Sequence, residues 1–138
     1  MTVESLAEDA PDVEDFIVCW LQPAIRAAMQ READDPLPFC VVAGVTAIDD
    51  VDAGFNASVV QLDVFARGIP ATKAAVKTVR RRMNQLARHL DNVTMSDNSI
   101  ASANYVQNQI DFERMDYADD QIVRYVARYG VGLSFVAV

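Results

Sequence analysis

Two segments of the chain repeat apolar residues at the spacing of a helix. The first follows Pro11, where Asp12 can accept a hydrogen bond from a free first-turn amide. Its apolar stripe runs to residue 28, and Pro23 inside it predicts a kink near Gln22 or a restart of the helix. The second segment runs from Thr72, the expected cap, to Leu90, and its apolar positions are Ala75, Val76, Val79, Met83, Leu86, Ala87 and Leu90.

Four further segments have the patterns of strands. Residues 39–48 are almost continuously apolar, which is typical of a buried strand, whereas residues 60–67 alternate between apolar and polar side chains. Residues 105–115 are less regular, and their polar insert at 107–109 predicts a bulge. Residues 123–137 alternate clearly, with Gly130 and Gly132 on the outer face, where missing side chains permit bending or a close approach.

The order helix–strand–strand–helix–strand–strand predicts an α+β fold. A mainly antiparallel sheet with both helices packed on one face would bury these apolar stripes. The 138 residues are 51% hydrophobic and 23% charged, the balance of one globular domain covering residues 1–138. Charge-free runs are too short for a membrane span, and the acidic N-terminus is unlike a secretory signal, so we expect a cytosolic chain without a membrane partner. Cys19 and Cys40, both in apolar surroundings, are expected to be free.

Charge is concentrated in one segment. Residues 1–69 hold 13 acidic and 3 basic residues, residues 70–90 hold 6 basic residues and no acid, and residues 91–138 hold 7 acidic and 3 basic residues, within a net charge of −8. On the second predicted helix the charges form a stripe opposite the apolar face, made of Lys73, Lys77, Arg80, Arg81 and Arg88. Three interpretations stay open: a solvated face, a nucleic-acid contact, or a contact with an acidic patch on a neighbouring copy.

Catalytic and cofactor chemistry finds little support in the sequence. The single histidine, His89, lies at a predicted helix end, and two distant cysteines cannot complete a zinc site with it. The glycine spacing matches no nucleotide-binding loop. An EF-hand beginning at Asp50 would put Phe55 where the loop needs glycine, so this match fails. We therefore expect no enzyme, no cofactor and no metal.

Two stretches together resemble a known family. The segment Asp12–Pro23 is similar to the opening helix of tail terminator proteins from long-tailed actinobacterial phages. The strand Val59–Ala66, followed by the helix Thr72–Leu90, is similar to that family's second strand and second helix. The predicted order of elements extends the resemblance over the whole chain, although the motifs are packing patterns without a catalytic signature.

The resemblance implies a structural protein of the virion, at the head-proximal end of the tail, that assembles in the host cytoplasm. It would form a homo-hexameric ring on the tail tube protein, stop tube polymerisation, and offer a surface to a connector or stopper protein. The genome would pass through its lumen without sequence-specific DNA binding. Two alternatives stay open: another head–tail component, such as a stopper or a head-completion adaptor, and a small-ligand-binding or enzymatic α+β domain.

The interface residues are inferred from loops and charge. Exposed loops on a rigid sheet commonly carry recognition, which selects an acidic loop and a later turn for contacts with the tube or connector: Asp49, Asp50, Asp52, Phe55, Asp116, Tyr117, Asp119 and Asp120. For contacts between subunits, the basic stripe would meet acidic residues of the N-terminal segment: Glu4, Glu8, Asp9, Asp12 and Asp15.

Overall fold

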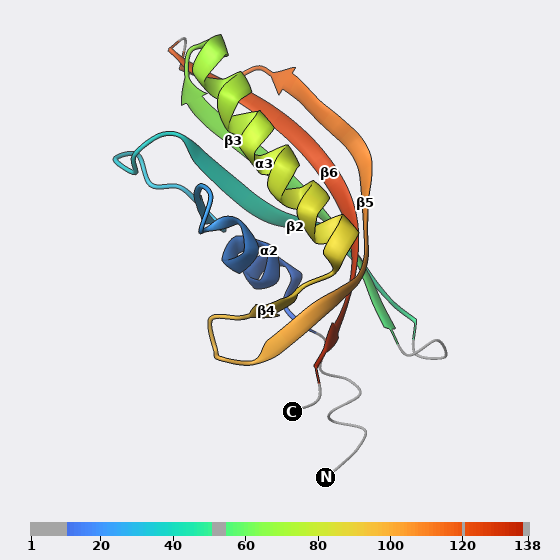
Figure 1. The fold of residues 1–138 in the computed structure, drawn as a ribbon. Coiled ribbons are helices and arrows are strands. Elements are labelled where there is room, and N and C mark those ends of the chain that lie inside the picture. The colour runs from blue at the N-terminus through green and yellow to red at the C-terminus, as the bar shows by residue number, and fades with distance from the viewer. Residues whose placement is uncertain (1–10, 51–54, 120, 137–138) are drawn as a thin grey trace.

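A computed structural model describes residues 11–50, 55–119 and 121–136, which form an α+β fold with a curled sheet and two helices (Figure 1). The helices are α2 (Val13–Leu21) and α3 (Ile69–His89). The strands are β1 (Arg26–Ala28), β2 (Phe39–Asp50), β3 (Phe55–Arg67), β4 (Asn92–Thr94), β5 (Ile100–Met115) and β6 (Ile122–Phe135). The described chain thus contains six strands, and the expected element order with four strands is wrong.

The six strands form one sheet in the order β1-β2-β3-β6-β5-β4. Only β1 and β2 are parallel; the other neighbours are antiparallel. The sequence predicted that both helices pack on one face of the sheet, and the structure differs from this arrangement. Helix α3 packs across β3, β6 and β5, whereas α2 contacts β1 and β2 at one margin of the sheet and β4 at the other. The sheet therefore curls around the helices, which brings its two margins toward α2 (Figure 1).

Helix α2 begins as predicted and ends earlier than predicted. The Asp12 carboxylate accepts hydrogen bonds from the amides of Glu14 (3.0 Å) and Asp15 (3.3 Å), which confirms it as the N-cap. The helix ends at Leu21 because Pro23 offers no amide and its ring would clash with the preceding turn. The next residues turn back and form β1, so the expected continuation of the helix to residue 28 is wrong.

Helix α3 confirms the second predicted helix and begins three residues earlier. Gly68 precedes it with φ +82°, a conformation that glycine adopts without strain, and Pro70 lies in the first turn. Thr72 is not the cap. Its side chain is buried, and its hydroxyl donates to the Gly68 carbonyl oxygen at 2.7 Å. The helix ends at His89, and the next residue, Leu90, is its C-cap and has left-handed backbone angles.

Three strands, β2, β3 and β5, extend beyond their predicted limits. In β2 and β3, Asp49 pairs with Asn56 and Asp50 pairs with Phe55, so the expected loop over residues 49–54 starts two residues too early. In β5 the register shifts between Asn108 and Ile110, which confirms a bulge in the polar insert. Register shifts and short flanking strands are local events, and the alternation of side chains does not encode them.

Trp20 joins the two helices within the core. This side chain is only 7% exposed, and its indole nitrogen donates to the Arg82 carbonyl oxygen at 2.8 Å. The Arg82 guanidinium donates in return to the Trp20 carbonyl oxygen at 2.7 Å and lies 3.7 Å from the centre of the indole ring. Trp20 is therefore a core residue, and it couples α2 to α3. Both cysteines are free, as expected.

Gly132 lies under an aromatic side chain. A Cβ atom at this position would lie 2.8 Å from Cδ1 of Tyr105, closer than such atoms approach. The sequence predicted bending or the close approach of another backbone at this glycine, whereas the group that approaches it is the ring of Tyr105 in β5.

Candidate interaction surfaces

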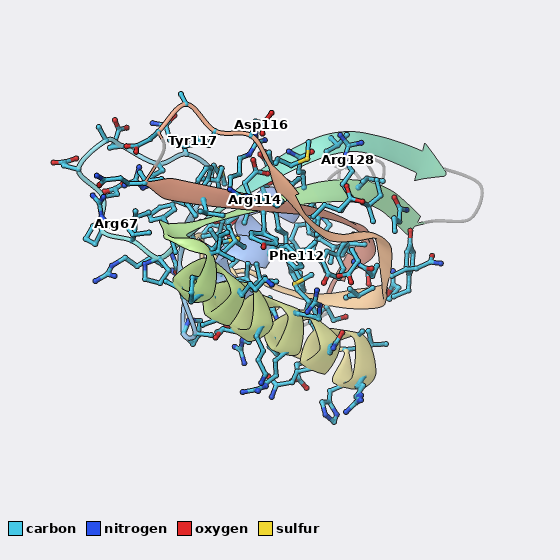
Figure 2. The ribbon with its side chains drawn as sticks, turned by 90° about the horizontal axis from the view of Figure 1, so that it is seen from above. Arg67, Phe112, Arg114, Asp116, Tyr117 and Arg128 are labelled. Atoms are coloured by element: carbon cyan, nitrogen blue, oxygen red, sulfur yellow. The ribbon has the colours of Figure 1, made fainter. Side chains whose placement is uncertain are left out.

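The exposed side of α3 carries a row of cations. Its opposite side is buried by Val76, Val79, Met83 and Leu86, which fixes the helix against the sheet. In Figure 2, seen from above, side chains of α3 extend away from the sheet. We call four exposed residues on this side the basic face: Lys73, Lys77, Arg81 and Arg88. None of the four makes an ion pair within the described residues.

Arg80 differs from the rest of the predicted stripe. It is half-buried and pairs with Asp111 of β5 at 2.9 Å, and its guanidinium lies 5.6 Å from the centre of the Phe112 ring. The amide of Phe112 and the Arg80 side chain both donate to the Asp111 carboxylate, which lowers the pKa of Asp111. Arg80 therefore fastens β5 to α3, and its charge is already matched within the chain.

The two groups of predicted tube or connector contacts lie at opposite ends of β3. Asp49 and Asp50 end β2 beside Phe55, the first residue of β3, while Asp52 falls outside the described residues. At the other end of β3, Arg67 pairs with Ile122, next to the turn that holds the second group. Thirteen residues of β3 separate the two groups, a path of about 40 Å along the strand.

Two residues of the second group, Tyr117 and Asp119, line an open depression of about 770 Å³. Asp116 and Tyr117 are exposed, and the Tyr117 ring packs edge-on against Phe65 with 5.1 Å between the ring centres. Figure 2 places Asp116 and Tyr117 on the side of the sheet away from α3. The Asp119 carboxylate accepts from the Gln121 amide at 2.8 Å and closes the turn, and Asp120 lies outside the described residues.

The acidic residues expected to meet the basic face have mixed positions. Glu4, Glu8 and Asp9 lie outside the described residues. Asp12 caps α2, and the Asp15 carboxylate accepts from the Ser96 amide at 3.1 Å, which links α2 to the turn between β4 and β5. These hydrogen bonds fix where the two carboxylates lie on the surface.

Asp12 and Asp15 line a second depression, of about 390 Å³, that the sequence did not reveal. Its lining combines carboxylates with exposed apolar side chains: Asp12, Asp15, Met29, Met95, Ser96, Asp97, Ser99 and Phe135. The Ser99 hydroxyl and amide both donate to the Asp97 carboxylate, which lowers the pKa of Asp97 and keeps it charged at neutral pH. We call this surface the acidic depression. No residue of α3 contributes to it.

The face of the sheet away from α3 carries a polar network that the sequence pattern did not predict. Arg124 of β6 pairs with Asp63 of β3 at 2.8 Å, with the side chains 28% and 13% exposed. The Gln61 amide donates to Asp63 at 2.9 Å, and Arg128 donates to the Gln61 oxygen at 3.1 Å. Alternation predicted the outward direction of Asp63 and Gln61 correctly, but it did not reveal that Asp63 is buried there.

Comparison with known proteins gives no relative: no protein-family model matches the chain, and no curated protein matches it significantly. Within the described ranges, His, Cys, Asp and Glu side chains form no group that could hold a metal ion. No helix of the described chain is long and apolar enough to cross a membrane.

Proposed function

We propose that this chain is a tail terminator of a long-tailed phage, a non-enzymatic virion protein that forms a ring on the end of the tail tube. In this role it stops the addition of tube subunits and presents its other side to a head-proximal connector protein. The proposal starts from the resemblance of Asp12–Pro23 and of Val59–Leu90 to that family.

The observation that carries the proposal is the placement of two contact regions at opposite ends of one rigid strand. A ring between a tube and a connector needs two axial contact surfaces on each subunit. The β2–β3 end carries Asp49 and Asp50, and the turn before β6 carries Asp116, Tyr117 and Asp119. Since β3 pairs with β2 on one side and with β6 on the other, the sheet holds the ends that carry the two regions apart.

Tube capping tests the proposal. Purified tail tubes are incubated with the chain, and capped ends are counted by negative-stain electron microscopy. The proposal expects a ring at one end of each tube and no further growth when tube subunits are added. Tubes that keep growing in the presence of excess protein would contradict it. Binding to the portal side of heads without tube capping would instead identify a head-completion adaptor.

Two matched variants then identify the tube-facing end. One replaces Asp49, Asp50 and Asp52 by Asn, and the other replaces Asp116, Asp119 and Asp120 by Asn. Both remove three negative charges, so they differ only in which end of the sheet loses them. We expect the first variant to lose tube capping and the second to retain it, because charged loops steer association with a partner. Equal capping by both variants would overturn the assignment of Asp49, Asp50 and Asp52 to the tube.

A further inference from the structure

The basic face of α3 and the acidic depression are complementary surfaces on the same molecule. The basic face spans Lys73 to Arg88, about 22 Å along the helix axis, and contains no acid. The acidic depression presents the carboxylates of Asp12, Asp15 and Asp97. None of these three carboxylates has a cation within ion-pair distance in the described chain. Each surface therefore exposes charge that the fold leaves unmatched.

The shape and lining of the depression suit a long cationic side chain. Lysine and arginine place a charged group at the end of an apolar stem, so they fit sites with carboxylates beside apolar walls. In the acidic depression, Met29 and Phe135 are each 45% exposed and provide such walls, while Met95 is buried beneath them. Without a covering partner, the exposed Met29 and Phe135 leave apolar surface in water beside the carboxylates.

We propose that the basic face of one copy docks on the acidic depression of the next copy, with Lys77 and Arg81 at the centre of the contact. Because α3 contributes no residue to the depression, the two surfaces are distinct, and the contact is head-to-tail. In any open chain of copies, this contact leaves a free basic face at one end and a free depression at the other. The chain of copies closes into a ring when these two ends meet. The inference rests on the proposed function in one respect: that copies of this chain associate with one another.

One double substitution on each surface tests the contact, and the one in the depression also removes the Asp97 carboxylate that accepts from Ser99. Lys77 and Arg81 are exposed and make no ion pair within the described chain, so Lys77→Glu with Arg81→Glu reverses the charge at the centre of the basic face and lowers the formal charge of its four residues from +4 to 0. In the depression, Asp12 and Asp15 support α2 and are left unchanged. Met29→Lys with Asp97→Lys changes the formal charge of the depression from −3 to 0, and circular dichroism checks that both variants remain folded.

The control changes the same charge elsewhere. The basic-face variant has a net charge of −12, because each of its two substitutions replaces a positive by a negative side chain and so lowers the net charge of −8 by two. Arg67→Glu with Arg114→Glu also gives −12, and both residues are exposed and lie outside α3 and the depression. A loss of association that comes only from added negative charge will therefore be equal in the two variants.

The test is self-association by sedimentation velocity, with no tail tube present. We expect the basic-face variant and the depression variant to associate at least about tenfold more weakly than the unchanged chain, while the control associates normally. Mixing the two weak variants should restore association, because the carboxylates introduced at positions 77 and 81 of one variant then face the amines introduced at positions 29 and 97 of the other. Both variants are net negative, at −12 and −5, so attraction between whole molecules cannot restore it.

Three results would overturn the inference: an unchanged chain that stays monomeric, equal weakening by the basic-face variant and the control, or a mixture that does not associate. Failure of the proposed function gives a different pattern, since a chain that associates as described here but does not cap tubes contradicts the tail-terminator role and leaves the contact intact.

Discussion

Replacement of Trp20 tests how the two helices are held together. In Trp20→Ala the core loses a side chain that is only 7% exposed, and such truncations cost about 3–5 kcal/mol of unfolding free energy. Two further losses are included in this figure: the hydrogen bond to the Arg82 carbonyl, about 1 kcal/mol, and the stacked guanidinium, about 1–2 kcal/mol where water is largely excluded. Trp20→Phe keeps a stacked ring but loses the hydrogen bond, so we expect it to cost about 1–2 kcal/mol.

A double-mutant cycle with Arg82→Met separates these contributions. Arg82 also donates to the Trp20 backbone oxygen, and this bond survives replacement of the indole. The coupling between Trp20→Ala and Arg82→Met therefore measures the stacked contact, and we expect about 1–2 kcal/mol. Urea unfolding followed by far-ultraviolet circular dichroism gives the free energies without relying on tryptophan fluorescence. An unchanged unfolding midpoint in Trp20→Ala would refute the reasoning and would place Trp20 outside the core.

Three other predictions concern single contacts. Asp63→Ala should cost about 2–3 kcal/mol in urea unfolding, because it leaves the partly buried Arg124 guanidinium without its partner, and Arg124→Met in the same chain should recover part of this loss. Gly132→Ala should cost about 1 kcal/mol by forcing the Tyr105 ring out of its position, and an equal cost in a Tyr105→Ala background would disprove this cause. Burial raises the pKa of the Cys40 thiol, so an unfolded thiol ionises above about pH 8.5 while the folded one stays neutral. Stability should therefore fall as pH rises above that value, and less steeply in Cys40→Ala; a thiol reagent at pH 8 should modify Cys40 only after urea is added.

Long elements were predictable because periodicity accumulates with length. Helix α3 has six turns of consistent apolar spacing, so its existence and its cationic side both followed from the sequence. Strands β1 and β4 have three residues each, too few for alternation to be visible. Residues 26–28 also continue the helical spacing of α2, and only the backbone constraint of Pro23 separates the two interpretations.

The candidate surfaces also differ in how far the sequence predicted them. The basic face belongs to one helix, so local spacing located it, but spacing did not reveal that Asp111 already pairs with Arg80. The acidic depression combines residues from α2, the segment after β1, the β4–β5 turn and the end of β6. No pattern within a single segment predicts such a surface, because it exists only after the sheet has curled and brought its margins to α2.

The contact between α2 and α3 also connects the core with the proposed assembly of copies into a ring. In a closed ring of identical head-to-tail contacts, the angle between the two contact surfaces of one subunit fixes how many subunits complete the circle. Here one surface lies on α3, and the other is built around the first turn of α2. The reciprocal hydrogen bonds and the stacked guanidinium between Trp20 and Arg82 join these two helices directly. This joint, together with the packing of both helices on the sheet, holds the angle on which the proposed ring depends, and a looser joint would permit rings of several sizes or open chains of copies.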